Sequence, residues 1–169
     1  MADSGRGYVR DRRGCRHWGP HGAAGLLLRQ DGRFLLQRRS WRVHHGRTWS
    51  TPGGALHTGE SAWDGAHREF AEELGGVPAL RPIHTFVDDH GGWAYHTVVA
   101  ELTEPFFPRR GDGEGAAYRW CAPAEIDSLR LHPGFAATWP QLLAAVDAMD
   151  GLTVRRPGSE PQPPRHGGV

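Results

Sequence analysis

The chain is organised around residues 54–76, GALHTGESAWDGAHREFAEELGG. Ser61 followed three residues later by Asp64 is a capping box, which predicts that a helix begins at Ala62. Gly75 stands where many helices end on a left-handed glycine, so the helix should end at Leu74. Apolar residues recur every four positions along it and predict a stripe that packs on a sheet. They are Ala62, Ala66, Phe70 and Leu74.

Three carboxylates share one face of this helix. Glu69, Glu72 and Glu73 stand at positions i, i+3 and i+4, so their side chains project in the same direction. Like charges at this spacing repel one another, and folding alone does not explain them. Magnesium takes carboxylate oxygens as ligands and keeps positions open for water and phosphate. The pattern predicts a divalent-metal site, with a solvated acidic helix face as the alternative.

Residues 54–76 as a whole resemble the Nudix box, G-x5-E-x7-R-E-U-x-E-E-x-G-U, in which U is an aliphatic residue. Its fixed positions are occupied by Gly54, Glu60, Arg68, Glu69, Glu72, Glu73 and Gly75. Two positions depart from the pattern, because Phe70 replaces the usual aliphatic residue and Gly76 stands where another is expected. Neither change touches a carboxylate, so the resemblance still implies a metal-dependent hydrolase.

The resemblance implies a fold and a set of metal ligands. The fold is α/β, the Nudix-type α/β/α sandwich with a mixed sheet between helices, and we assign it to residues 20–153. By the same resemblance, Glu69, Glu72, Glu73 and the carbonyl of Gly53 hold Mg²⁺, for which Mn²⁺ could substitute.

The remaining catalytic roles also come from the resemblance. Many Nudix enzymes carry an acid in the loop before a tryptophan-containing strand, and Glu114 matches it best, with Asp112 as the fallback. The general base is therefore either Glu69 or Glu114. Arg68 is expected to pair with Glu60 and to orient Glu69, which completes the catalytic group.

The rest of the folded part is expected to consist of strands and one further helix. The strands fall at 23–28, 34–36, 83–87, 93–102 and 118–120, and the helix at 135–149. Asp31-Gly32 between the first two strands is a hairpin turn signal. Residues 41–52 lack a period and predict a loop. The final helix should bury Leu142, Leu143, Val146 and Met149.

Candidate substrate contacts lie outside the box. Arg38 and Arg39 are adjacent on a strand and point in opposite directions, so one of them could face a pocket. Arginine suits the recognition of phosphates and bases. Together with Trp49 and Phe135, these residues form the predicted substrate-binding set.

Length and composition indicate one domain. The chain has 169 residues and a formal net charge of +1, which gives no general case for a nucleic-acid polymer or a membrane as partner. It contains no apolar run of transmembrane length and no signal-peptide pattern, so we expect a cytoplasmic protein. We expect a flexible basic arm at 1–19 and a disordered Pro/Gly-rich tail at 154–169. A homodimer is left open.

The box implies hydrolysis of a nucleoside diphosphate linked to a group X, without identifying X. The segments HWGPHGAAGLLL, VDDHGGWAYHTVVAEL and LHPGFAATWPQL resemble actinobacterial MutT-type enzymes. That resemblance favours 8-oxo-dGTP or a related oxidised purine triphosphate, cleaved to monophosphate and pyrophosphate. One alternative is a coenzyme A or ADP-ribose pyrophosphatase. A second is a domain that senses a nucleotide without cleaving it, although such domains often lose box carboxylates.

Overall fold

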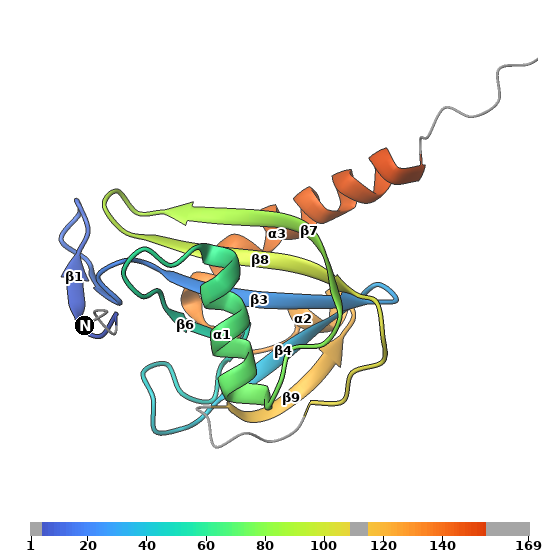
Figure 1. Cartoon of the computed structure of the whole chain (residues 1–169), viewed down its shortest axis with the longest axis horizontal. Coiled ribbons are helices and arrows are strands. Elements are labelled where there is room, and N and C mark those ends of the chain that lie inside the picture. The colour runs from blue at the N-terminus through green and yellow to red at the C-terminus, as the bar shows by residue number, and fades with distance from the viewer. Residues whose placement is uncertain (1–4, 109–114, 155–169) are drawn as a thin grey trace, which may run out of the picture.

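The computed structural model describes residues 5–108 and 115–154 (Figure 1). Its elements, in chain order, are β1 (Tyr8–Arg10), β2 (Arg16–Trp18), β3 (Ala23–Gln30), β4 (Arg33–Arg39), β5 (Trp49–Ser50), β6 (Gly53–Ala55), α1 (Ala62–Leu74), β7 (Leu80–Asp89), β8 (Ala94–Leu102), β9 (Gly115–Cys121), α2 (Pro123–Asp127) and α3 (Pro133–Val154). Helices cover both faces of a mixed sheet, with α1 on one side and α2 and α3 on the other, which confirms the expected sandwich (Figure 1).

In the main sheet, β3 and β4 separate beyond their shared turn, and β6, the strand before α1, pairs with β3 there. Its strand order is β5-β4-β3-β8-β7, with β6 paired to β3 and β9 paired to β4. β3 and β8 are parallel, whereas the other pairs are antiparallel. β3 and β4 pair next to their shared turn, at Arg29–Phe34 and Gln30–Arg33. Beyond that turn β6 takes the place beside β3, which brings the segment before α1 into the sheet.

The core has two halves, one on each face of the sheet. Because strand residues alternate in direction, Leu26 and Leu28 pack under α1 while Leu27 packs against α3. The half under α1 includes Phe70, and the half under α3 includes Trp139. The site-bearing helix is therefore held by a core of its own.

Helix α1 has the predicted bounds, Ala62–Leu74. The Ser61 hydroxyl accepts a hydrogen bond from the Asp64 amide at 3.1 Å. Gly75 ends the helix in the left-handed region, with φ of 79°. The predicted stripe is also confirmed, because Ala66, Phe70 and Leu74 are buried, with Ala62 partly buried beside them.

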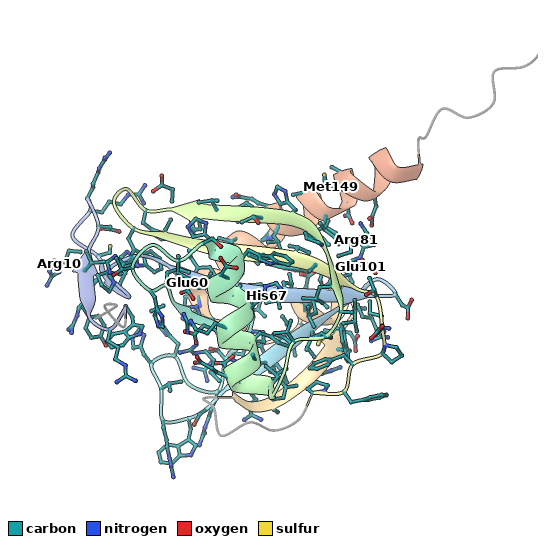
Figure 2. The ribbon with its side chains drawn as sticks, in the orientation of Figure 1. Arg10, Glu60, His67, Arg81, Glu101 and Met149 are labelled. Carbon is teal, nitrogen blue, oxygen red and sulfur yellow. The ribbon has the colours of Figure 1, made fainter. Side chains whose placement is uncertain are left out.

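The final helix differs from the prediction in its length and at one residue. α3 begins before residue 135 and continues past 149. Leu142 and Val146 are buried as expected, but Met149 is exposed, so its assignment to the core is wrong. Figures 1 and 2 show why, because the last turns of α3, which carry Met149, extend beyond the sheet. None of the helices among the described residues is long and apolar enough to cross a membrane.

The N-terminal segment contains structure that was not expected. We predicted a flexible arm over residues 1–19, whereas β1 and β2 form an antiparallel hairpin over residues 8–18. This hairpin is held on the β7–β8 turn, because the Arg12 amide donates to the Gly91 carbonyl at 2.9 Å. The Trp93 indole NH also donates to the Gly19 carbonyl at 2.8 Å. At the other end, most of the predicted tail, residues 155–169, lies outside the described residues.

Candidate active site

Arg68 joins the loop before α1 to the helix. Its Nε and Nη2 donate to the two carboxylate oxygens of Glu60 at 2.8 and 2.9 Å. Its Nη1 donates to Glu69 Oε1 at 2.7 Å, and Nη2 also donates to the Ala55 carbonyl at 2.9 Å. The expected pairing of Arg68 with Glu60 and its contact with Glu69 are therefore confirmed. A forked guanidinium pair of this kind fixes both direction and position.

The two carboxylates that Arg68 contacts have opposite electrostatic environments. Glu60 also accepts a bond from the His57 amide at 2.9 Å. The Arg68 hydrogen bonds, followed by this amide, lower the pKa of Glu60 to about 2. Burial instead raises the pKa of Glu69, and it outweighs the opposing effect of Arg68. Glu69 is thus the better proton acceptor of the two, because a higher pKa means a stronger base.

Two glycines bring the backbone against α1. In β6, Gly53 lies opposite Gly25 of β3, and Gly54 lies opposite Ala24. A Cβ on Gly54 would overlap the carboxylate of Glu69, and one on Gly53 would overlap the backbone of Ala24. The box therefore needs glycine here for close approach. A metal-ligand role for the Gly53 carbonyl stays a prediction.

The three box carboxylates differ in how far they are exposed to solvent. They are Glu69, Glu72 and Glu73. The Glu72 side chain is 62% exposed and lies 3.6 Å from Arg68 Nη1. Glu73 is only 7% exposed, and its Oε1 accepts a hydrogen bond from Gln37 Nε2 at 3.2 Å. Glu69 lies between these extremes, with 19% of its side chain exposed.

This donor set fits hard divalent ions, although not as one closed site. Oxygens around a single Mg²⁺ lie at about 2.1 Å from it and so at most about 4.2 Å from one another. Among the described residues, the group of metal-type ligands whose donor atoms all lie within 4.8 Å is Asp11, His17 and His90, not the box carboxylates. Among the described residues, three box carboxylates therefore do not bring their donor atoms to within 4.8 Å of one another.

Sequence reasoning missed Gln37 as part of the site. Its side chain is buried on β4, and it points at Glu73, with Oε1 lacking a hydrogen bond among the described atoms. Tyr118 of β9 adds a hydroxyl bond to the Glu73 carbonyl at 3.2 Å. Burial, followed by the charge of Glu73, raises the pKa of Tyr118 to about 12. The sequence does contain an indication of this role, because Gln37 directly follows the apolar residues Phe34-Leu35-Leu36. A polar side chain buried in such a strand normally has a hydrogen-bond partner.

The four predicted substrate residues have different surroundings. Arg38 is exposed, while Arg39 is half-buried and its Nε donates to the His44 carbonyl at 3.3 Å. Trp49 and Phe135 pack with the core cluster on the face opposite α1. Their role in binding substrate stays a prediction. Glu114 and Asp112, the candidate bases in the long loop, lie outside the described residues.

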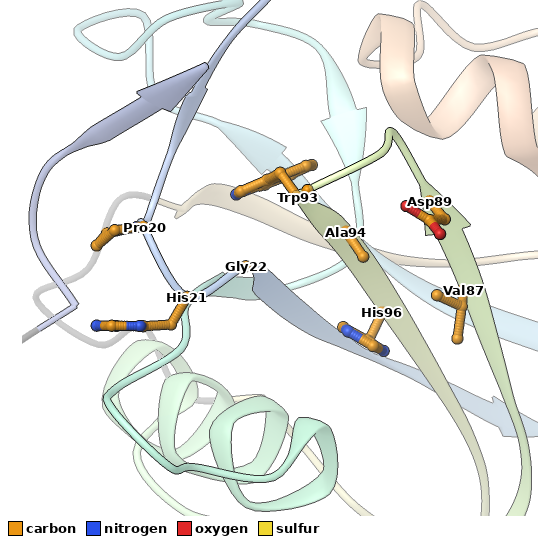
Figure 3. A pocket seen from close by; sticks show the side chains of 9 residues that line it. Pro20, His21, Gly22, Val87, Asp89, Trp93, Ala94 and His96 are labelled. Carbon is orange, nitrogen blue, oxygen red and sulfur yellow. The ribbon is translucent and has the colours of Figure 1, made fainter. Parts of the chain in front are cut away.

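A hollow of about 310 Å³ lies between the segment before β3 and the β7–β8 hairpin (Figure 3). It is lined by Pro20, His21, Gly22, Val87, Asp89, Gly92, Trp93, Ala94 and His96. None of the box residues is among them, although His21 Nε2 lies 3.1 Å from the Thr58 hydroxyl of the box segment.

The chain belongs to the Nudix family, because the NUDIX domain model matches residues 19–142. A protein of Mycobacterium tuberculosis, named as a candidate 8-oxo-dGTP diphosphatase, is 42% identical over 155 residues, covering 83% of this chain and 70% of that protein. A MutT-like protein of Streptomyces ambofaciens is 31% identical over 134 residues, covering 76% of this chain and 75% of that protein.

A solved structure gives the same classification. The crystal structure of a Nudix hydrolase from M. smegmatis, RenU, superposes with a TM-score of 0.74 at 36% identity, covering 92% of this chain and 99% of that one. The protein is therefore a Nudix hydrolase, which confirms the expected enzyme class, a pyrophosphohydrolase. Members of this family act on small nucleotide substrates and generally use divalent metals.

Proposed function

We propose that this protein hydrolyses 8-oxo-dGTP or a related oxidised purine nucleoside triphosphate, in a Mg²⁺-dependent reaction that yields the monophosphate and pyrophosphate. The observation that carries the reaction type is the complete box, in which Arg68 bonds both Glu60 and Glu69 while Glu73 lies at its buried end. The substrate rests on the name of the 42% identical mycobacterial relative.

The residues fit the metal that this reaction needs. Glu69, Glu72 and Glu73, with the Gly53 carbonyl, would hold Mg²⁺, since carboxylate and carbonyl oxygens are its preferred protein ligands. When bound, the metal would neutralise phosphate charge and lower the pKa of a coordinated water.

The chain itself would supply positioning and proton transfer. Arg68 fixes the Glu69 carboxylate through a charged bond of 2.7 Å. Glu69 would accept a proton from the attacking water. Glu114 is the alternative base. Water adds to one phosphorus, a phosphoanhydride bond breaks, and the leaving phosphate group carries away the electron pair.

The test is turnover of 8-oxo-dGTP beside dGTP, ADP-ribose and coenzyme A, with Mg²⁺ and with EDTA, and with the products identified. We expect a preference for 8-oxo-dGTP, release of pyrophosphate, and loss of activity in EDTA that Mg²⁺ restores. Faster cleavage of ADP-ribose or coenzyme A would support the proposed hydrolysis but reject 8-oxo-dGTP as the substrate. Tight nucleotide binding without turnover of any of the four would instead assign the domain to nucleotide sensing.

A further inference from the structure

A second group of metal-type ligands lies where the N-terminal hairpin meets the β7–β8 turn. We call Asp11, His17 and His90 the histidine–aspartate cluster. One donor atom from each lies within 4.8 Å of the others. Asp11 comes from the turn of the hairpin, His17 from β2, and His90 from the turn after β7. Two segments distant in sequence, the N-terminal hairpin and the β7–β8 turn, therefore converge on this point, at the end of the molecule where β1 lies (Figure 1).

The nitrogen atoms of the two histidines gather around one carboxylate oxygen of Asp11. His90 Nε2 lies 3.0 Å from Asp88 Oδ2, and because a carboxylate accepts, Nε2 carries the hydrogen. The other ring nitrogen, Nδ1, lies 3.9 Å from Asp11 Oδ2. His17 Nε2 lies 2.9 Å from the same oxygen. One oxygen of Asp11 therefore has a ring nitrogen of each histidine within 4 Å of it.

Each ligand is also held in direction by a second partner. Asp11 Oδ1 accepts bonds from the amides of Arg13 and Cys15 at 2.9 and 2.8 Å, which aims Oδ2 at the histidines. The His17 ring stacks on Trp93, with centroids 4.1 Å apart and planes at 14°. Outer contacts of this kind, with a carboxylate behind one histidine, are what orient the ligands in known metal sites.

We propose that Asp11 Oδ2, His17 Nε2 and His90 Nδ1 bind Zn²⁺, at a site distinct from the Nudix box. Zinc takes carboxylate and imidazole ligands at about 2.0–2.2 Å in tetrahedral geometry, which places neighbouring donor atoms about 3.4 Å apart. The two separations measured from Asp11 Oδ2, 2.9 and 3.9 Å, lie on either side of that value. The fourth position is left for water.

The ion would join the hairpin to the body of the protein. Asp11 and His17 belong to the hairpin segment and His90 to the β7–β8 turn, which the bond from the Arg12 amide to the Gly91 carbonyl already brings together. A metal bound in the folded state and not in the opened one stabilises the closed arrangement by mass action. Binding also displaces the proton that His17 Nε2 shares with Asp11, so Zn²⁺ binding should release protons.

The test is titration of the full-length protein with Zn²⁺, and with Co²⁺ as a visible-absorption probe, in excess Mg²⁺ to occupy the box. We expect one tight ion per chain with the absorption of tetrahedral Co²⁺, and at least about a hundred-fold weaker binding in His90→Gln. His45→Gln is the matched control, because it removes an imidazole from the separate group His44, His45 and His132 and should leave binding unchanged.

A second measurement on the unmodified protein removes any dependence on the folding of a variant. Nitrogen NMR of the histidine rings should show His17 and His90 shifting when one equivalent of Zn²⁺ is added, while His84 on β7 does not shift. Absence of tight Zn²⁺ binding, equal affinity in His90→Gln, or loss of binding in His45→Gln would each overturn the proposal. None of these outcomes depends on the substrate of the Nudix site.

Discussion

At the scale of single residues, Glu73 is the box carboxylate that is buried in the protein interior. It is 7% exposed, and its Oε1 accepts a hydrogen bond from the side-chain amide of Gln37 at 3.2 Å. A divalent ion bound by the box carboxylates would offset part of the cost of burying the charge of Glu73. Gln37 acts here as a positioning residue, since its amide holds one oxygen of Glu73 in place.

Glu73→Gln should therefore lower turnover by at least about a hundred-fold without unfolding the protein. The amide side chain keeps the size of the original and an oxygen for Gln37, but it loses the negative charge. The measurement is kcat with Mg²⁺ together with the thermal midpoint. Glu104→Gln, at an exposed glutamate outside the box, is the control and should retain full activity. Activity near the unmodified level in Glu73→Gln would reject the metal assignment.

Gly54→Ala tests the close approach of β6 to the box. Because the new Cβ would overlap the Glu69 carboxylate, that side chain must move away from its bond to Arg68. A small misplacement of catalytic groups costs about a hundred-fold in rate, and we expect kcat to fall on that order. Gly151→Ala adds the same methyl group where nothing lies within 4 Å, so its kcat should not change. Equal rates for the two variants would show that Glu69 tolerates displacement.

At the scale of elements, α1 is fixed by its buried stripe as well as by its caps. Phe70→Ala should lower the free energy of unfolding by about 3–5 kcal/mol, because the ring is fully buried under the helix and leaves a cavity. Phe107→Ala is the matched control, since that ring is 84% exposed and should cost little. Urea unfolding of both variants measures the difference. Similar costs for the two would mean that α1 is not anchored by this residue.

The loop before α1 is held to the helix by an ion pair, so this contact should depend on pH. In the folded state the pKa of Glu60 is lowered from its ordinary 4.5 to about 2 by Arg68. The stabilisation is therefore complete above pH 4.5 and is lost as the pH falls toward 2. Glu60→Gln should cost about 2 kcal/mol at pH 7.

The measurement for this pair is the difference in unfolding free energy between Glu60→Gln and the unmodified protein at pH 7 and at pH 3. Other titrating groups affect both proteins alike and cancel in the difference. We expect the gap to narrow at the lower pH. A gap that stays constant would assign the stabilisation to packing rather than to charge.

Elements with local signals were predictable, and contacts between distant elements were not. The bounds of α1 followed from Ser61 and Gly75, and the β3–β4 turn followed from Asp31-Gly32, because each signal acts within a few residues. The contact of Arg68 with Glu60 was predictable because only eight residues separate them across the start of α1. Gln37 was missed because its position beside Glu73 depends on how β4 lies against α1, which no local pattern specifies.

At the scale of the whole molecule, the N-terminal hairpin is the part of the fold that depends on contacts between distant elements. Residues 1–19 are rich in arginine and glycine, a composition typical of an unstructured terminus. What holds β1 and β2 is contributed by the β7–β8 turn, through Gly91 and Trp93. Two short strands alone are marginally stable, so their pairing depends on this docking. The same docking forms the histidine–aspartate cluster.

This dependence predicts how the hairpin responds to loss of one contact. Trp93→Phe removes the indole NH that donates to the Gly19 carbonyl and reduces the stack on His17. At about 1 kcal/mol for such a bond, hydrogen exchange of the Arg12 amide should become about five-fold faster. The amide of Leu27, in the central strand β3, should exchange as before. Trp41→Phe, at an exposed tryptophan, is the control. An Arg12 amide that exchanges equally fast with and without the indole would mean that Trp93 does not hold the hairpin, and that the Arg12–Gly91 bond is sufficient.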